Sequence, residues 1–416
     1  MKVLHLSYSD NYGGAFIAAR RIHSALLSAN LDSIMWVSKL QQGDERITAP
    51  GGSYTKARNN LNKLVAKCAV KCVENNQNSL LSPALLRGTL VKKINNSDAD
   101  VVNLHWINGE MLSISDIGRI TKPIVWTLHD MWPLCGAEHY AQDDRWQVGY
   151  NDTNRPKSKR GFDLNRWVWN KKKRHWTRKI HLVSPSQWLS QLASQSLLFR
   201  GSDVTTIGHP IDLTEWHPVD RSNARLELNL PENTPLILFG AVGGVSDPRK
   251  GFDLLLASMQ RLKLLQPNFE VVVFGGQKNA QLSELGVKVH VFAHTTNTKE
   301  LIKIYSAADV FALPSRQEAL GLTGMEALSC GLPVVAFGNS GSGSMIKHEE
   351  TGFIVPAFDV ERFAHGLKWC IHNSKTKNLD RSARIFAEQN FAPVKVANQY
   401  KKVYEFALDT HVNCEV

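Results

Sequence analysis

Residues 309–337, DVFALPSRQEALGLTGMEALSCGLPVVAF, decide the fold because they describe one complete strand–loop–helix–strand unit. The apolar run at residues 310–313 predicts a buried strand, and residues 322–329 are rich in helix-forming side chains. Gly331, Leu332 and Pro333 end that helix before the next apolar strand at 334–337. Glu318 therefore lies in the loop after the first strand, and Glu326 lies within the helix.

The start of this helix is a candidate anion site. Gly321 and Gly324 keep its first turn open, and the backbone N–H groups of a first helical turn have no partner within the helix. Carboxylates at Glu318 and Glu326, one on each side of such a site, can hold sugar hydroxyls around a bound phosphate. The alternative is a solvated helix with two surface acids, which the spacing alone leaves open.

The segment resembles the signature of the retaining glycosyltransferases of family 4. This resemblance implies an α/β protein of the GT-B fold, with two Rossmann-like domains facing a central cleft, and a nucleotide diphosphate sugar as donor. It also implies that Glu318 contacts hydroxyls of the donor sugar and that Glu326 holds the ribose of the nucleotide. The backbone amides of Leu322 and Thr323 would meet the diphosphate.

The length and composition of the chain agree with two soluble domains. A chain of 416 residues is long for one hydrophobic core, and its 43% hydrophobic and 21% charged residues are ordinary values for a globular protein. No apolar run reaches the roughly 18 residues of a spanning helix, and the N-terminus reads as a first strand rather than a signal peptide. Six cysteines without metal-ligand spacing predict reduced thiols in a cytoplasmic protein.

Short apolar strands alternate with helical stretches in both halves, which predicts parallel α/β layers. A breaker-rich hinge follows residue 206, and the resemblance places an acceptor-side domain at 1–207 and a nucleotide-sugar-binding domain at 208–390. Apolar residues at helical spacing after Pro393 predict a C-terminal helix, about 391–416, which in the GT-B fold crosses back to the first domain. The expected strands lie near 3–8, 33–38, 101–105, 123–127 and 182–185, and at 236–240, 271–274, 289–292, 310–313, 334–337 and 353–355.

Two glycine turns follow expected strands. Gly13 and Gly14 stand between the first strand and a helix, and they resemble the loop that lets the backbone approach donor phosphate or acceptor in this family. A plain turn is the alternative. Gly275 follows the strand at 271–274 and resembles the turn that approaches the nucleotide base.

His129 follows the strand at 123–127, where the family places a histidine near the reacting sugar. There it would donate or accept a hydrogen bond with a donor-sugar hydroxyl rather than act as a nucleophile. A structural histidine is the alternative. Asp130 and Trp132, which come next, are expected on the acceptor side.

The loop at 242–252 carries the expected cations. In this family an arginine and a later Lys-Gly pair both reach the diphosphate. Lys250 and Gly251 match the pair, but Gly244 occupies the arginine position and Arg249 is the nearest arginine. Two cations can stabilise a departing diphosphate without a metal, so no metal or other cofactor is expected. The alternative is a basic turn in solvent.

The segment from Arg155 to Lys179, called the basic segment below, holds eleven Lys or Arg and one acid, so 11 − 1 gives +10 of the formal net charge of +11. Its three tryptophans, Trp167, Trp169 and Trp176, are interleaved with the cations. This composition suits an anionic membrane surface or a lipid-diphosphate acceptor, and no nucleic acid is expected. The alternative is a solvated helix whose tryptophans pack inward.

The combined motifs resemble bacterial exopolysaccharide or O-antigen enzymes, including colanic-acid-type transferases. The expected function is transfer of a sugar to a saccharide or lipid-linked oligosaccharide in cell-surface polysaccharide synthesis. The expected location is the cytoplasm, with peripheral contact at the inner face of the cytoplasmic membrane. The alternatives are a GT-B sugar phosphorylase, a nucleotide-sugar epimerase, and a non-catalytic basic protein that binds membrane or nucleic acid.

Overall fold

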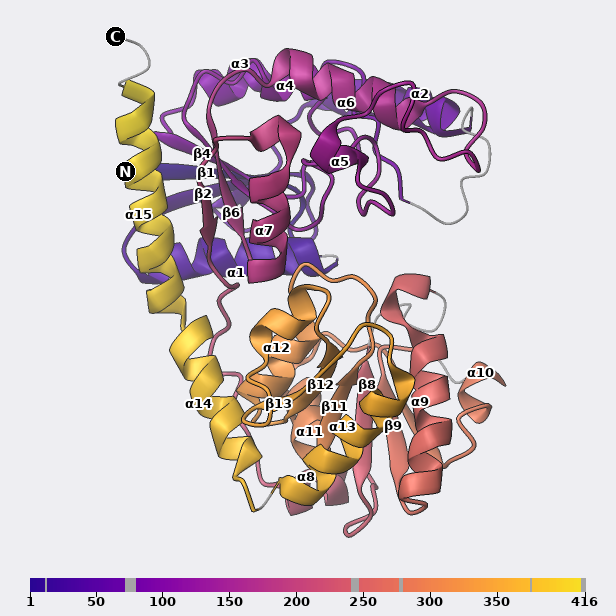
Figure 1. Ribbon diagram of the computed structural model, residues 1–416. Coiled ribbons are helices and arrows are strands. Elements are labelled where there is room, and N and C mark those ends of the chain that lie inside the picture. The colour runs from indigo at the N-terminus through magenta and orange to yellow at the C-terminus, as the bar shows by residue number, and fades with distance from the viewer. Residues whose placement is uncertain (12, 72–79, 241–246, 277–279, 375, 413–416) are drawn as a thin grey trace. The chain divides into compact units, whose positions relative to one another are not determined.

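The computed structural model of the protein describes residues 1–11, 13–71, 80–240, 247–276, 280–374 and 376–412 (Figure 1). The chain divides into two compact units, which are described separately below. Unit 1 contains residues 1–209 and 393–416, and unit 2 contains residues 210–392.

Unit 1 is built on a sheet in which every strand pair is parallel. Across the sheet the order is β3-β2-β1-β4-β5-β6-β7. The chain therefore proceeds outward from β1 in one direction and then continues from β4 in the other, so the topological switch point lies between β1 and β4. The strands are β1 (Lys2–Ser9), β2 (Asp32–Lys39), β3 (Ile47–Thr48), β4 (Val101–Leu104), β5 (Ile124–Thr127), β6 (Ile180–Ser184) and β7 (Val204–Thr206).

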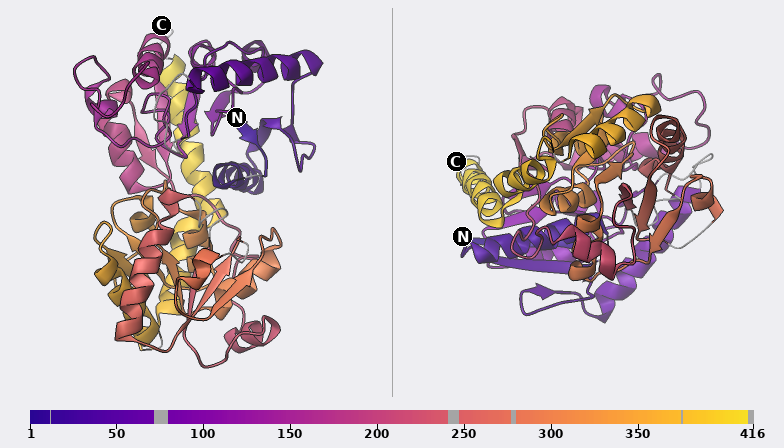
Figure 2. Two further views of the ribbon diagram at one scale, coloured as in Figure 1. Left: turned by 90° about the vertical axis from the view of Figure 1, so that its right-hand side faces the viewer. Right: turned by 90° about the horizontal axis from the view of Figure 1, so that it is seen from below.

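Helices cover both faces of this sheet, as buried parallel strands require. The C-terminal helix α15 packs against α1, β4 and β5, and it runs along the sheet of unit 1 in Figures 1 and 2. Its residues Val396, Tyr400 and Tyr404 are buried, as the helical spacing in the sequence predicted. The helices of unit 1 are α1 (Gly14–Ser28), α2 (Ser53–Lys71), α3 (Leu90–Asn95), α4 (Ile114–Ile117), α5 (Arg145–Val148), α6 (Leu164–His175), α7 (Gln187–Gln195), the 3₁₀ helix η1 (Leu197–Phe199) and α15 (Pro393–Val412).

Unit 2 is a second parallel sheet with the order β10-β9-β8-β11-β12-β13. Its switch point lies between β8 and β11. Successive residues of each strand enter different cores: Leu236 and Leu238 pack on one face of the sheet, and Ile237 and Phe239 pack on the other. The strands are β8 (Leu236–Gly240), β9 (Glu270–Phe274), β10 (Val289–Phe292), β11 (Val310–Leu313), β12 (Val334–Phe337) and β13 (Gly352–Val355).

The helices of unit 2 alternate with its strands along the chain. Helix α12 (Leu322–Ser329) has the bounds that the sequence predicted, and Gly331, Leu332 and Pro333 separate it from β12. The others are α8 (Arg221–Glu227), η2 (Pro248–Lys250), α9 (Phe252–Leu265), α10 (Ala280–Ser283), α11 (Thr298–Ala307), η3 (Gly341–Met345), α13 (Val360–Asn373) and α14 (Leu379–Phe391).

The predicted strands are found within about two residues of their expected bounds, and the two-domain parallel α/β fold is confirmed. Strands β3 and β7 were not predicted from the sequence. Strand β3 has two residues, and in β7 both Thr205 and Thr206 are exposed, so neither strand carries the apolar run on which the predictions depended.

Candidate active site

In open α/β sheets, ligands bind at the carboxyl ends of the strands, at the topological switch point. In unit 2 the loops after β8 and β11 flank that point. Lys250 comes from the first loop and Glu318 from the second, and the Lys250 ammonium forms an ion pair with Glu318 Oε1. The same oxygen accepts a hydrogen bond from Ser315 Oγ at 3.2 Å. The structure thus joins two predicted site residues that are 68 positions apart.

Two glycines allow close approaches to the loop after β11: Gly251 in the loop after β8, and Gly341 of η3 after β12. Gly251 follows Lys250 with a φ of 68°, and a Cβ there would lie 2.0 Å from the carbonyl oxygen of Pro314. Gly341 donates its backbone N–H to the carbonyl oxygen of Glu318 at 2.9 Å, and a Cβ there would lie 2.0 Å from the carbonyl oxygen of Ala319. A side chain at either position would displace the backbone that holds the ion pair.

Lys250 pairs with Glu318, whereas its neighbour Arg249 pairs with Asp247. Its guanidinium bonds Asp247, with 2.7 Å from Nη2 to Oδ2, and 48% of its side chain is exposed. Its carbonyl oxygen accepts the backbone N–H of Arg316 at 2.7 Å, and Arg316 also bonds the carboxylate of Asp253. The cations of this loop are therefore held by acids. Gly244, at the position of the family arginine, lies outside the described residues.

Glu326 lies one to two turns into α12, and it is 8% exposed. Its Oε2 accepts a hydrogen bond from the Tyr305 hydroxyl of α11 at 3.1 Å. Leu322 and Thr323 form the first turn of α12 and are partly exposed, as is Gly275 at the end of β9. Within unit 2, the predicted residues therefore lie on the loops and the helix start that follow β8, β9 and β11.

In unit 1, Gly13 and Gly14 are exposed at the start of α1, after β1. His129 follows β5 and is half-buried. Its Nε2 lies 3.0 Å from Nδ1 of His105, which follows β4. Burial lowers the pKa of His129 to about 4, so its imidazole is neutral at ordinary pH. His105 was not singled out from the sequence, although it ends a predicted strand as His129 does.

The polar groups of the Asp130 and Trp132 side chains form hydrogen bonds with other residues of the protein. The Asp130 carboxylate bonds His139 Nδ1 at 2.5 Å and accepts the indole N–H of Trp106 at 2.9 Å. Burial raises the pKa of Asp130, but the charge and hydrogen bond of His139 more than offset this, and the pKa lies below its usual value. Trp132 is fully buried and donates its indole N–H to Ser82. This burial does not support the prediction that Trp132 meets an acceptor.

The basic segment is not a continuous basic surface. Lys172 of α6 is fully buried, and its ammonium donates to three carbonyl oxygens, those of Trp132, Cys135 at 3.0 Å and Gly136 at 2.8 Å. Trp169 is buried as well, so neither of these two side chains is accessible to a membrane surface or an acceptor. Helix α6 turns one face inward, so Trp169 packs inward as the alternative interpretation expected, whereas Trp167 is exposed.

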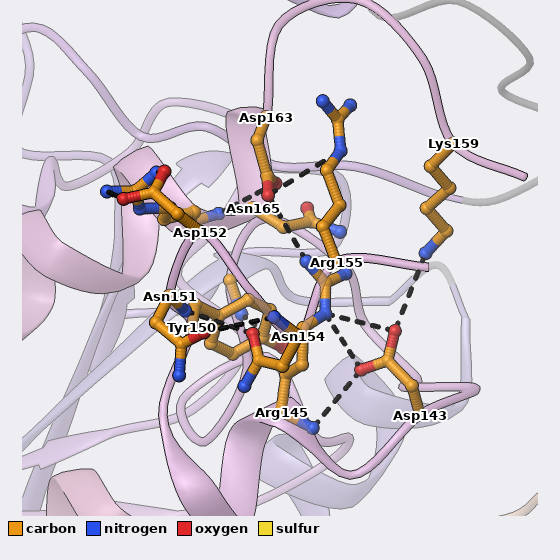
Figure 3. Close-up of polar contacts among 12 residues, drawn as sticks. Asp143, Arg145, Tyr150, Asn151, Asp152, Asn154, Arg155, Lys159, Asp163 and Asn165 are labelled. Carbon is orange, nitrogen blue, oxygen red and sulfur yellow. Dashed lines mark hydrogen bonds and ion pairs between the residues drawn. The ribbon is translucent and has the colours of Figure 1, made fainter. Parts of the chain in front are cut away.

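Asp163 within the segment and Asp143 before it pair with some of the cations in this region (Figure 3). Arg145, which is buried, bonds Asp143 at 3.1 Å and Asp163 at 3.3 Å. Arg155 of the basic segment lies 3.6 Å from the same Asp163, and Lys159 lies 3.9 Å from Asp143. In the described ranges, no helix has the length and hydropathy that a membrane span needs.

Comparisons with known proteins agree with this architecture. Residues 220–386 match the family described as "Glycosyl transferases group 1". A "D-inositol 3-phosphate glycosyltransferase" of Saccharomonospora viridis is 30% identical over 221 residues, which are 49% of this chain and 50% of that protein. The chain therefore spans about half the length of this curated relative.

Two solved structures are similar over nearly the whole chain. The sucrose-phosphate synthase (tll1590) of Thermosynechococcus elongatus has a TM-score of 0.67 at 18% identity and covers 99% of this chain and 100% of that one. Anabaena Alr3699/HepE in complex with UDP and glucose has a TM-score of 0.64 at 17% identity and covers 97% of this chain and 99% of that one. The chain thus has the two-domain α/β fold of GT-B glycosyltransferases, and residues 220–386 of its second unit are similar to the glycosyl transferases group 1 family.

Proposed function

We propose that the protein is a retaining glycosyltransferase that moves a sugar from a nucleotide diphosphate sugar to a saccharide acceptor. The observation that carries this proposal is the ion pair between Lys250 and Glu318 at the switch point of unit 2. The family resemblance assigns the lysine to the donor diphosphate and the carboxylate to the donor sugar. One donor molecule carries both the diphosphate and the sugar, so the two side chains that bind these groups must lie close together. The ion pair between Lys250 and Glu318 meets this requirement.

The proposed chemistry uses charge and position rather than a covalent intermediate. The bond between the sugar anomeric carbon and the diphosphate oxygen breaks, and a bond from that carbon to the acceptor oxygen forms on the same face. The acceptor hydroxyl loses its proton to the departing diphosphate. Lys250, with Arg249 beside it, stabilises the negative charge that develops there, while Glu318 accepts hydrogen bonds from sugar hydroxyls. Glu326 accepts hydrogen bonds from ribose hydroxyls.

The proposed acceptor is a saccharide, lipid-linked in cell-surface polysaccharide synthesis. The exposed cations of the basic segment, among them Lys173 and Arg174, support contact with an anionic lipid surface or lipid diphosphate. The similarity to a D-inositol 3-phosphate glycosyltransferase supports a second candidate, a phosphorylated polyol acceptor. Both candidates use the same donor chemistry.

A donor screen followed by an acceptor screen tests the function. A nucleoside diphosphate that binds only the native protein raises its melting temperature, so a panel of nucleoside diphosphates identifies the base. Transfer is then measured with the matching nucleotide sugars and each acceptor class, and the anomeric configuration of the product is read by NMR. Release of nucleoside diphosphate that depends on an acceptor supports the proposal. Phosphate-dependent breakdown of a saccharide would instead indicate a phosphorylase, and interconversion of nucleotide sugars an epimerase.

Glu326→Ala should weaken nucleoside diphosphate binding by about ten- to a hundredfold. A hydrogen bond to a charged group contributes about 1.5–3 kcal/mol, and 1.4 kcal/mol corresponds to tenfold in the dissociation constant. Isothermal titration with the nucleotide found in the screen measures the change.

The matched control is Tyr305→Phe, which removes only the hydroxyl that bonds Glu326 and leaves the carboxylate in place. It should affect nucleotide affinity less than Glu326→Ala does. Equal affinity of the wild type and Glu326→Ala would refute the ribose assignment.

A further inference from the structure

One face of the unit 1 sheet changes from apolar to polar toward the carboxyl ends of its strands. Val3 of β1, Val101 of β4 and Val125 of β5 pack against residues of α1 and α15 in one core. Because side chains alternate along a strand, the residues two positions on, such as His5, point to the same face. Asn103 of β4 is paired with His5 in the β1–β4 register. A buried polar layer therefore lies between this core and the strand ends.

The histidines of this layer form a hydrogen-bonded row. His5 Nδ1 lies 2.8 Å from His105 Nε2, and His105 Nδ1 lies 3.0 Å from His129 Nε2. His5 and His105 are buried, and only His129 at the end of the row is partly exposed. Burial lowers the pKa of all three imidazoles far enough to keep them neutral at ordinary pH.

A row of neutral imidazoles has two possible proton arrangements, because each ring has one N–H donor and one bare acceptor nitrogen. In the first, every Nε2 carries the proton, and His5 is left with an Nε2–H group. In the second, every Nδ1 carries the proton, and His5 is left with a bare Nε2. His5 Nε2 is buried and has no hydrogen-bond partner. Buried donors without a partner are rarer than buried acceptors without one, which favours the second arrangement.

The ring plane of His129 is held from another side. His209, which follows β7, stacks on His129 with a centroid distance of 5.3 Å and an interplanar angle of 24°. Its ring is buried, so it has little room to move. The row and the stack together restrict both the orientation and the proton position of His129.

We infer that His105 and His5 are positioning residues that fix His129 in the tautomer with the proton on Nδ1. His129 Nε2 then accepts from His105, and Nδ1–H is a permanent neutral donor for a hydroxyl or phosphate oxygen of a ligand. That the ligand is the donor sugar rests on the proposed function, whereas the tautomer itself does not. In a solvent-exposed histidine, Nδ1 can be either a hydrogen-bond donor or an acceptor. In this arrangement Nδ1 of His129, the atom that meets the ligand, is always a donor.

The tautomer is measured by ¹⁵N NMR on the full chain labelled at histidine. The signal of His129 is identified by its loss in His129→Gln. We expect Nδ1 to be protonated, Nε2 to be a bare acceptor, and neither to titrate between pH 6 and pH 8. Protonation at Nε2 would overturn the inference, whatever the activity of the protein.

Two substitutions at His105 separate positioning from packing. An asparagine amide stands where Nδ1 stands in histidine, so His105→Asn retains a donor to His129. The longer side chain of His105→Gln reaches the Nε2 position instead, so it retains the contact with His5 and loses the one with His129. We expect His105→Gln to lower kcat by about tenfold, the equivalent of one hydrogen bond, and His105→Asn to stay close to the wild type.

The controls separate this inference from the proposed function. In a His129→Gln background, His105→Gln should have no further effect on kcat. The positioning role is wrong if His105→Asn and His105→Gln lower kcat equally. It is also wrong if His105→Gln lowers kcat by the same factor in the His129→Gln background as in the wild type. A protein with no transferase activity at all would refute the proposed function, while the NMR measurement would still decide the tautomer.

Discussion

Lys250→Met should lower kcat/KM for sugar transfer by about 10²–10³-fold, the loss seen when one preorganised charge-stabilising group is removed. Lys250 is the cation that contacts Glu318 at the switch point of unit 2, so its ammonium lies beside the group assigned to the donor sugar. The loss should fall mainly on kcat, because the charge on the diphosphate oxygen develops as the sugar leaves. Steady-state kinetics with the identified donor measure it.

Arg249→Met is the matched control, since it removes the neighbouring cation of the same loop. Arg249 is nearly half exposed and bonds Asp247, so its loss should cost less than the loss of Lys250. Melting temperatures show whether either variant is unfolded. If both substitutions reduce kcat/KM equally, the two cations share the diphosphate and the special role of Lys250 is wrong. If neither does, the diphosphate is bound elsewhere.

Lys172→Met should lower the free energy of unfolding of unit 1 by about 2–4 kcal/mol. The ammonium of Lys172 donates to the carbonyl oxygens of Trp132, Cys135 and Gly136, and it lies 3.8 Å from the centroid of the Trp132 ring. Each carbonyl that loses its donor in a buried place costs about 1–3 kcal/mol, partly offset because the methionine needs no dehydration of a charge. Urea unfolding followed by tryptophan fluorescence measures the loss.

The adjacent Lys173→Met is the matched control, because Lys173 is exposed on the same helix and its substitution should change stability by less than about 0.5 kcal/mol.

Burial lowers the pKa of Lys172 to about 7, whereas the unfolded chain keeps the usual value near 10.5. Between these values the unfolded state binds more protons, so the stability of the wild type rises with pH there. The deficit of Lys172→Met should therefore widen from pH 7 to pH 10, and a constant deficit would contradict this.

The same pair of variants tests the lipid-surface proposal. Binding to anionic vesicles should weaken with Lys173→Met and with rising salt, because exposed cations act through a screened surface potential. Lys172 cannot contribute directly because it is buried. Vesicle binding that is independent of both salt and Lys173 would leave the basic segment without this role.

The sequence alone determined the strand order along the chain and the bounds of α12, because these depend on local apolar runs and on breakers such as Gly331 and Pro333. It also identified Glu318 and Lys250 as separate candidates by their resemblance to a family motif. It did not predict β7, because Thr205 and Thr206 are exposed and no apolar run marks the strand.

Only the tertiary structure decided which candidates meet. The contact between Lys250 and Glu318, the burial of Lys172, and the row from His5 to His129 each join residues far apart in the chain. A charge or an imidazole acquires its pKa, its partners and its accessibility from the residues that surround it in space. Local sequence patterns carry no information about those distant neighbours. The sequence alone therefore could not show that Lys172 is buried and Lys173 is exposed.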